Sequence, residues 1–172
     1  MSPRRSARDV AIGGLFLALA LALPPLFHLM GLGSVFLPML LPIVSAGFLA
    51  NWQIAATVGL LAPLISGLIT GMPPFVPPIA FMMMAELALL GLAPSLLYRT
   101  LRWNFWVALI LTLVINRAVV FLLRFVLAEF FSIPGIAYSL AVVTAGLPGI
   151  ALILIAVPLI VKTVEQKTGK RG

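Results

Sequence analysis

LTLVINRAVVFLLRF, residues 111–125, reads as the middle of a membrane-spanning helix, although it contains Asn116, Arg117 and Arg124. The apolar run around it extends from about Phe105 to Phe130. That run is longer than the roughly 20 residues that a helix needs to cross about 30 Å of hydrocarbon. A charge at this depth is costly and normally faces a protein interior or a water-filled cavity. The stretch therefore predicts a membrane helix with an inward-facing polar side.

The composition of the whole chain agrees with this prediction. Its 172 residues are 63% hydrophobic and 9% charged, whereas soluble domains are about a quarter charged. We expect one membrane domain covering residues 1–172. The absence of cysteine excludes disulfides, thiolate metal sites and a cysteine nucleophile. The net charge of +7 comes from short basic clusters between apolar runs, which is typical of membrane topology rather than nucleic-acid binding.

Six apolar segments have the character of membrane spans, which predicts an all-α integral membrane protein with six transmembrane helices. They run roughly from Val10 to Met30, Ser34 to Ala50, Gln53 to Thr70, Ile79 to Tyr98, Phe105 to Phe130 and Tyr138 to Val161. The second segment is short and contains two prolines. Between the third and fourth, GMPPFVPP (residues 71–78) cannot form a regular helix, because its four prolines remove backbone donors. It is either a lid or a connection.

The basic residues orient these spans. They form three clusters: Arg4, Arg5 and Arg8; Arg99 and Arg102; and Lys162, Lys167, Lys170 and Arg171. With six spans all three clusters fall on one side, and the opposite loops contain no lysine or arginine. Because basic loops stay in the cytoplasm, both termini are predicted to be cytoplasmic. The basic N-terminus also allows a signal peptide, but no small-residue cleavage site follows before Pro24, so we expect a retained first span.

The ionisable and polar residues at membrane depth are the candidate binding residues: His28, Glu86, Asn116, Arg117 and Arg124. Arg117 lies about 18 Å along its span from the cytoplasmic side, and Glu86 about 10 Å from the outer side, so the two can approach. Arg124 lies two turns beyond Arg117 on the same helical face.

Two interpretations of these charges remain open. In the first, Glu86 and Arg117 form a structural ion pair, and Arg124 extends to the outer headgroups. In the second, a cavity opens to the outside and its arginines grip a carboxylate or phosphate. Both hold if Glu86 positions Arg117 for the ligand.

Other residues also have two interpretations. His28 alone is more typical of packing than of a metal site, which needs several ligands. Met82 to Met84 either pack ordinarily or include a pocket-lining residue. Gly14, Ala18 and Ala22 are small residues at helical spacing, suited to internal helix packing or to docking of a separate membrane subunit. We find no phosphate-binding loop, HExxH motif or plausible serine–histidine pair, so no metal, cofactor or enzymatic activity is expected.

Three stretches carry a family resemblance: GLFLA (residues 14–18), VFLPMLLPIVSAGFLA (residues 35–50) and LLAPLISGLITGMPPFVPPIAFMMMAELALLGL (residues 60–92). They resemble the substrate-binding S components of energy-coupling factor (ECF) vitamin transporters, in the pantothenate-like and niacin-like branch. Gly14 and Ala18 match the spacing of the family's Ala-x-x-x-Ala docking motif, with glycine in place of the first alanine. Leu40 follows FLPM, where relatives often carry histidine.

The resemblance implies a six-span protein of the prokaryotic plasma membrane that captures a vitamin from outside. It would dock on a transmembrane coupling subunit that works with two ATPase subunits, and it would hydrolyse nothing itself. Two arginines and few other deep charges suit an anionic substrate such as pantothenate or nicotinate. The alternatives are a non-catalytic structural subunit of another membrane complex and an integral membrane enzyme.

Overall fold

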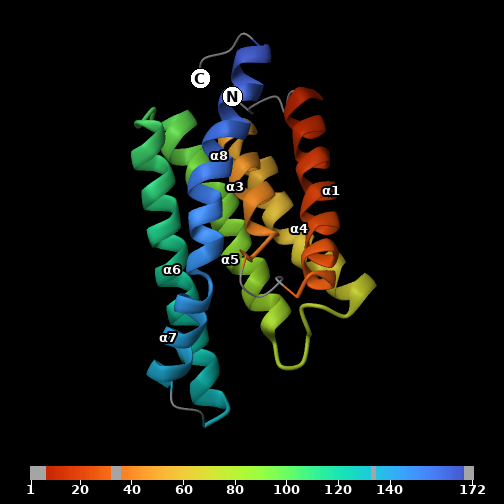
Figure 1. Cartoon of the computed structure of the whole chain (residues 1–172), viewed down its shortest axis with the longest axis vertical. Coiled ribbons are helices and arrows are strands. Elements are labelled where there is room, and N and C mark those ends of the chain that lie inside the picture. Colours follow the sequence, from red (N-terminus) through yellow and green to blue (C-terminus); the bar gives the residue numbers. More distant parts are fainter. Residues whose placement is uncertain (1–6, 32–35, 133–134, 169–172) are drawn as a thin grey trace.

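The computed structural model describes residues 7–31, 36–132 and 135–168, and within these ranges the chain is helical without strands. The elements are α1 (Ala7–Leu29), α3 (Leu40–Leu49), α4 (Trp52–Thr70), α5 (Ile79–Pro94), η1 (Ser95–Thr100), α6 (Phe105–Phe130), α7 (Gly135–Ala145) and α8 (Leu147–Thr168). They run side by side along the long axis of the molecule (Figure 1). The predicted all-α class is confirmed. Arg4, Arg5, Ser34, Lys170 and Arg171, which entered the topology prediction, lie outside the described residues.

Five of the helical segments are long and apolar enough to cross a membrane: α1, α4, α5 continued by η1, α6, and α7 continued by α8. The beginning of α1, the end of η1, the beginning of α6 and the end of α8 lie at one end of the molecule (Figure 1). The described members of the three basic clusters therefore share one end, as the topology argument requires. The count of six spans and the cytoplasmic side remain predictions.

The second expected span differs from a full membrane helix. Instead of the whole segment from Ser34 to Ala50, the helix α3 has 10 residues, about 15 Å at the rise of an α-helix. All of its residues except Leu41 are buried, and it lies among α1, α5 and α8 (Figure 1). A helix enclosed by other helices faces protein instead of lipid, so it needs no membrane-spanning length.

Glycines allow the three central helices to pack at backbone distance. A Cβ added to Gly59 of α4 would collide with the backbone of Leu87 in α5, and one added to Gly91 of α5 would collide with the backbone of Ala55 in α4. A Cβ on Gly47 of α3 would lie 2.6 Å from the carbonyl oxygen of Gly91. Small residues serve this purpose in membrane helix packing, because they let backbones approach closely.

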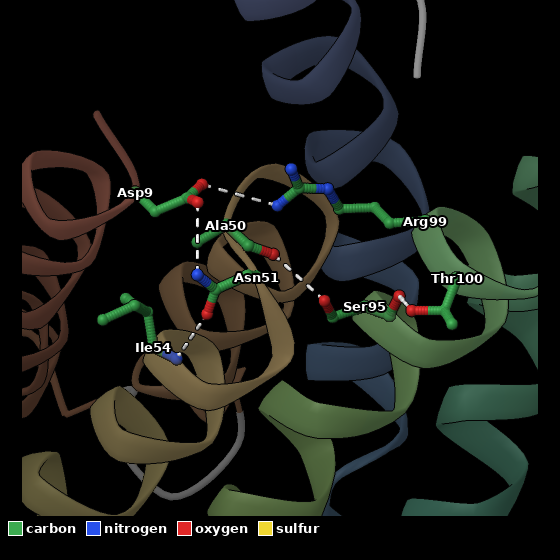
Figure 2. Close-up of polar contacts among 7 residues, drawn as sticks. All are labelled: Asp9, Ala50, Asn51, Ile54, Ser95, Arg99 and Thr100. Atoms are coloured by element: carbon green, nitrogen blue, oxygen red, sulfur yellow. Dashed lines mark hydrogen bonds and ion pairs between the residues drawn. The ribbon is translucent and has the colours of Figure 1, made fainter. Parts of the chain in front are cut away.

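At the end where α1 begins, four residues join the helices through polar contacts, and we call them the polar clamp: Asp9, Asn51, Ser95 and Arg99 (Figure 2). Asn51 caps α4 by accepting from the Ile54 N–H at 3.0 Å and donates through Nδ2 to Asp9 at 3.2 Å. The Arg99 Nη1 lies 3.6 Å from the same carboxylate. Ser95 donates to the carbonyl of Ala50 at 3.1 Å. The clamp therefore connects α1, the start of α4 and η1.

Candidate functional site

The side-chain amide of Asn116 links Arg117 of α6 to Glu86 of α5 through hydrogen bonds. Asn116 donates from Nδ2 to the Glu86 carboxylate at 3.1 Å, and its Oδ1 accepts from Arg117 through Nε at 3.1 Å and through Nη2. Glu86 and Asn116 are buried. The predicted approach of Glu86 to Arg117 is confirmed, but Asn116 bridges them. Within the described residues Glu86 and Arg117 make no direct ion pair. The interpretation in which these two residues form a structural ion pair is therefore wrong.

Arg124 lies on the same side of α6 and remains inside the protein. Its side chain is only 9% exposed, and its Nη1 is buried without a hydrogen-bond partner among the described residues. The interpretation in which this arginine extends to the outer headgroups is therefore wrong. Glu86 is close enough to experience the charges of both arginines, so this part of the interior holds one carboxylate and two guanidinium groups.

The other edge of Arg117 faces the break between α7 and α8. A Cβ added to Gly146 would lie 2.7 Å from Arg117 Nη1 and 2.7 Å from Leu37 Cδ1, so those two atoms are at most twice that distance apart. A Cβ added to Gly149 would lie 2.6 Å from the carbonyl oxygen of Phe36. The two glycines at the start of α8 thus make room for residues 36 and 37 and for the guanidinium of Arg117.

A cavity of about 420 Å³ lies at the end opposite the polar clamp, within the usual range of small-molecule sites. Its walls come from the end of α1, residues 37–40, the end of α4, the loop that follows and one methionine of α5. They include Pro24, Pro25, His28, Leu37, Met72 and Met83. Of the five predicted binding residues, only His28 lines this cavity. We call it the proline-walled cavity.

The proline-rich loop of residues 71–78 builds one wall of this cavity. Ser66 donates to the carbonyl of Met72 at 2.7 Å, and Thr70 donates to the carbonyl of Ser66 at 2.8 Å. Both hydroxyl protons are therefore committed to backbone carbonyls. The ring of Phe75 contacts that of Phe81 edge to face, with centroids 5.6 Å apart. The loop is thus packed against α4 and α5.

Arg117 lines a second, smaller cavity of about 280 Å³ between α6 and α8. Its other walls are apolar and include Leu113 and Ile150. Glu86, Asn116 and Arg124 line neither cavity. The structure therefore brings Glu86, Asn116 and Arg117 together, with Arg124 nearby, and places His28 apart from them in the proline-walled cavity.

The three predicted docking residues lie on the outer face of α1. Gly14, Ala18 and Ala22 are exposed, and a Cβ added to Gly14 would meet no described atom within 4 Å. The neighbouring Gly13, in contrast, is buried against Ile54 of α4. Internal packing of this small-residue face, one of the two interpretations, is therefore wrong for the described chain. The face remains open to lipid or to another protein.

Sequence reasoning missed Leu37, Ser66 and Gly146 as parts of the site. Gly146 had a readable signal, because GLPG interrupts an apolar run and such residues mark breaks. Leu37 had none, since its importance comes from neighbours that lie far away in the sequence.

Neither a protein family, nor a curated protein, nor a solved structure matches the chain. The fold itself defines the class: the described part of the chain is all-α and contains five helical segments long and apolar enough to cross a membrane, which is compatible with a multi-pass membrane protein.

Proposed function

We propose that this protein is the substrate-capturing S component of an ECF-type importer for a small water-soluble vitamin or related micronutrient. In this proposal it resides in the prokaryotic plasma membrane with six membrane segments and both termini in the cytoplasm. The observation that carries the proposal is the proline-walled cavity, which lies inside an apolar helical chain at the end away from the basic clusters. Under the proposed orientation, that end faces the outside, where substrate is captured.

The exposed face of α1 supports the partner side of the proposal. Gly14, Ala18 and Ala22 present a smooth surface that no described helix covers. Small residues let a second helix approach closely in lipid, where van der Waals packing drives association. The transmembrane coupling subunit would dock here, and two ATPase subunits would supply the energy. A purely structural subunit would need this face but would have no use for a cavity of ligand size.

The test is a thermal-shift screen of the purified protein against water-soluble vitamins, including pantothenate and nicotinate. A ligand at a hundredfold excess over its Kd stabilises the folded state by about 2.7 kcal/mol, so a true substrate should raise the melting temperature clearly. Met83→Trp fills part of the cavity and should abolish the shift. Leu89→Trp, at an exposed residue of the same helix that lines neither cavity, is the matched control and should preserve it.

A second arm of the same experiment examines docking. Gly14→Trp combined with Ala18→Trp should prevent co-purification with the coupling module while the thermal shift persists. A wild-type protein that binds none of the vitamins would refute the capture function. A double variant that still assembles would refute the docking face.

A further inference from the structure

Leu37 lies between the proline-walled cavity and Arg117. Its side chain lines the cavity, and its Cδ1 shares the space beside Gly146 with Arg117 Nη1. The guanidinium is thus close to the cavity but does not line it. The side chain of Leu37 thus belongs both to the cavity wall and to the surroundings of the Arg117 guanidinium.

The backbone at Leu37 has an unusual conformation for its residue type. Its φ is +47°, in the left-handed region that a residue with a bulky side chain rarely adopts. Such conformations persist only where the surroundings impose them, and they gather at ligand clamps and switches. The carbonyl of Leu37 accepts from the N–H of Leu40 at 2.9 Å, so this conformation is part of the turn that starts α3.

The guanidinium of Arg117 is oriented so that one of its edges is hydrogen-bonded and another edge has no hydrogen-bond partner among the described residues. The Nε and Nη2 groups donate to Asn116 Oδ1, whose amide is in turn fixed by Glu86. The edge formed by Nη1 and the second N–H of Nη2 donates to no partner among the described residues. That edge carries two parallel N–H donors, the arrangement that matches the two oxygens of a carboxylate.

We propose that Leu37 is a gate, and that the substrate is a monocarboxylate with a largely uncharged body. The body occupies the proline-walled cavity, and Leu37 turns aside so that the carboxylate reaches the free edge of Arg117. Asn116 and Glu86 are positioning residues that hold the guanidinium ready. This inference rests on the proposed function and adds to it the substrate class and the route by which the charge is recognised.

The experiment compares acids with neutral counterparts of nearly the same shape. The probes are nicotinate against nicotinamide and pantothenate against panthenol, each titrated calorimetrically into the purified protein. The acid that binds should bind at least tenfold more tightly than its neutral counterpart. Arg117→Ala should weaken binding of the acid by roughly 30-fold or more, the loss of affinity expected on truncating one partner of a buried charge pair. Binding of the neutral probe should not change, which also shows that the variant is folded.

The gate is tested by kinetics. Leu37→Ala should increase the association rate constant of the acid several-fold, because the gate no longer has to open first. Leu60→Ala removes the same atoms from an exposed residue of α4 that lines neither cavity and should leave that rate near wild type. Arg117→Lys should recover only part of the affinity, since an ammonium group lacks the planar fork.

The outcomes separate this inference from the proposed function. Equal binding of acid and neutral probe, both indifferent to Arg117→Ala, would overturn the inference and leave vitamin capture intact. Loss of both probes in Arg117→Ala and in Arg117→Lys would show a structural arginine and would also overturn it. Equal association rates in Leu37→Ala and Leu60→Ala would remove the gate. Absence of binding by any vitamin would refute the proposed function itself.

Discussion

The two ends of the molecule are held together in different ways. At one end, the polar clamp joins α1, the start of α4 and η1 through side chains that come from distant parts of the sequence (Figure 2). At the other end, the hydroxyls of Ser66 and Thr70 bond only to α4 and the loop that follows it. The apolar end of α1 there borders a cavity. Polar side chains therefore link separate helices at one end, whereas at the other the hydroxyls of Ser66 and Thr70 link only neighbouring parts of the chain.

The largest expected effect comes from the clamp. Asn51→Ala removes both the cap of α4 and the donor to Asp9, so it should lower the free energy of unfolding by about 2–3 kcal/mol. Asn104 caps α6 by accepting from the Trp106 N–H at an exposed site. Asn104→Ala is thus the matched control and should cost about 1 kcal/mol. Thermal unfolding in detergent measures both, and equal losses would show that the bond to Asp9 contributes nothing to the difference between the ends.

A smaller effect is expected at the cavity end. Ser66→Ala removes the shorter of two hydroxyl contacts to the carbonyl of Met72, the other coming from Thr70 at 3.2 Å, and should cost about 1 kcal/mol. Amide hydrogen exchange should accelerate in residues 71–78, since that loop loses a bond to α4. Ser139→Ala removes a buried hydroxyl that bonds within its own helix, to Gly135 at 2.7 Å, and should leave the loop unchanged. Faster exchange in both variants, or in neither, would contradict the view that Ser66 fixes this wall.

The smallest effect is expected for the charge in the clamp. Asp9→Asn retains an oxygen that can accept from Asn51 and removes the attraction to Arg99, whose side chain is 35% exposed. Ion pairs of this kind contribute about 0–1 kcal/mol and are screened by salt. The loss should be within that range at low salt and vanish at about 1 M salt. A loss as large as that of Asn51→Ala would mean that charge, rather than hydrogen bonding, holds this end closed.

The sequence was most informative where a helix is both long and bounded by clear signals. The expected span from Phe105 to Phe130 coincides with α6, because Asn104 caps its start and an apolar run fills it. It was least informative for α3 and for the last span. Hydropathy counts apolar residues but does not show whether they face lipid or protein, so the buried, short α3 was predicted too long. The interruption at Gly146 depends on contacts with Arg117 and Leu37 that no local pattern contains.

The sequence predicted how far along their helices the residues of the candidate site lie, but not which of these residues contact one another. Counting residues along two antiparallel spans correctly brought Glu86 and Arg117 to the same level. The sequence could not show that Asn116 would bridge them, because that depends on how each helix is rotated about its axis. Nor could it show that His28 would line a cavity without the arginines, since that cavity is assembled from five separate segments.

The π-helical turn η1 changes the direction in which the following side chains point around the helix axis at the clamp end. Its backbone bonds reach one residue further than in an α-helix, as in the bond from the Leu101 N–H to the Leu96 carbonyl at 2.8 Å. One additional residue corresponds to a rotation of about 100°. Within this turn the consecutive residues Tyr98 and Arg99 contact two different neighbours, Glu165 of α8 and Asp9 of α1. Deleting one residue from this turn would restore a uniform helix, leave the hydropathy of the span almost unchanged, and misalign both contacts at once.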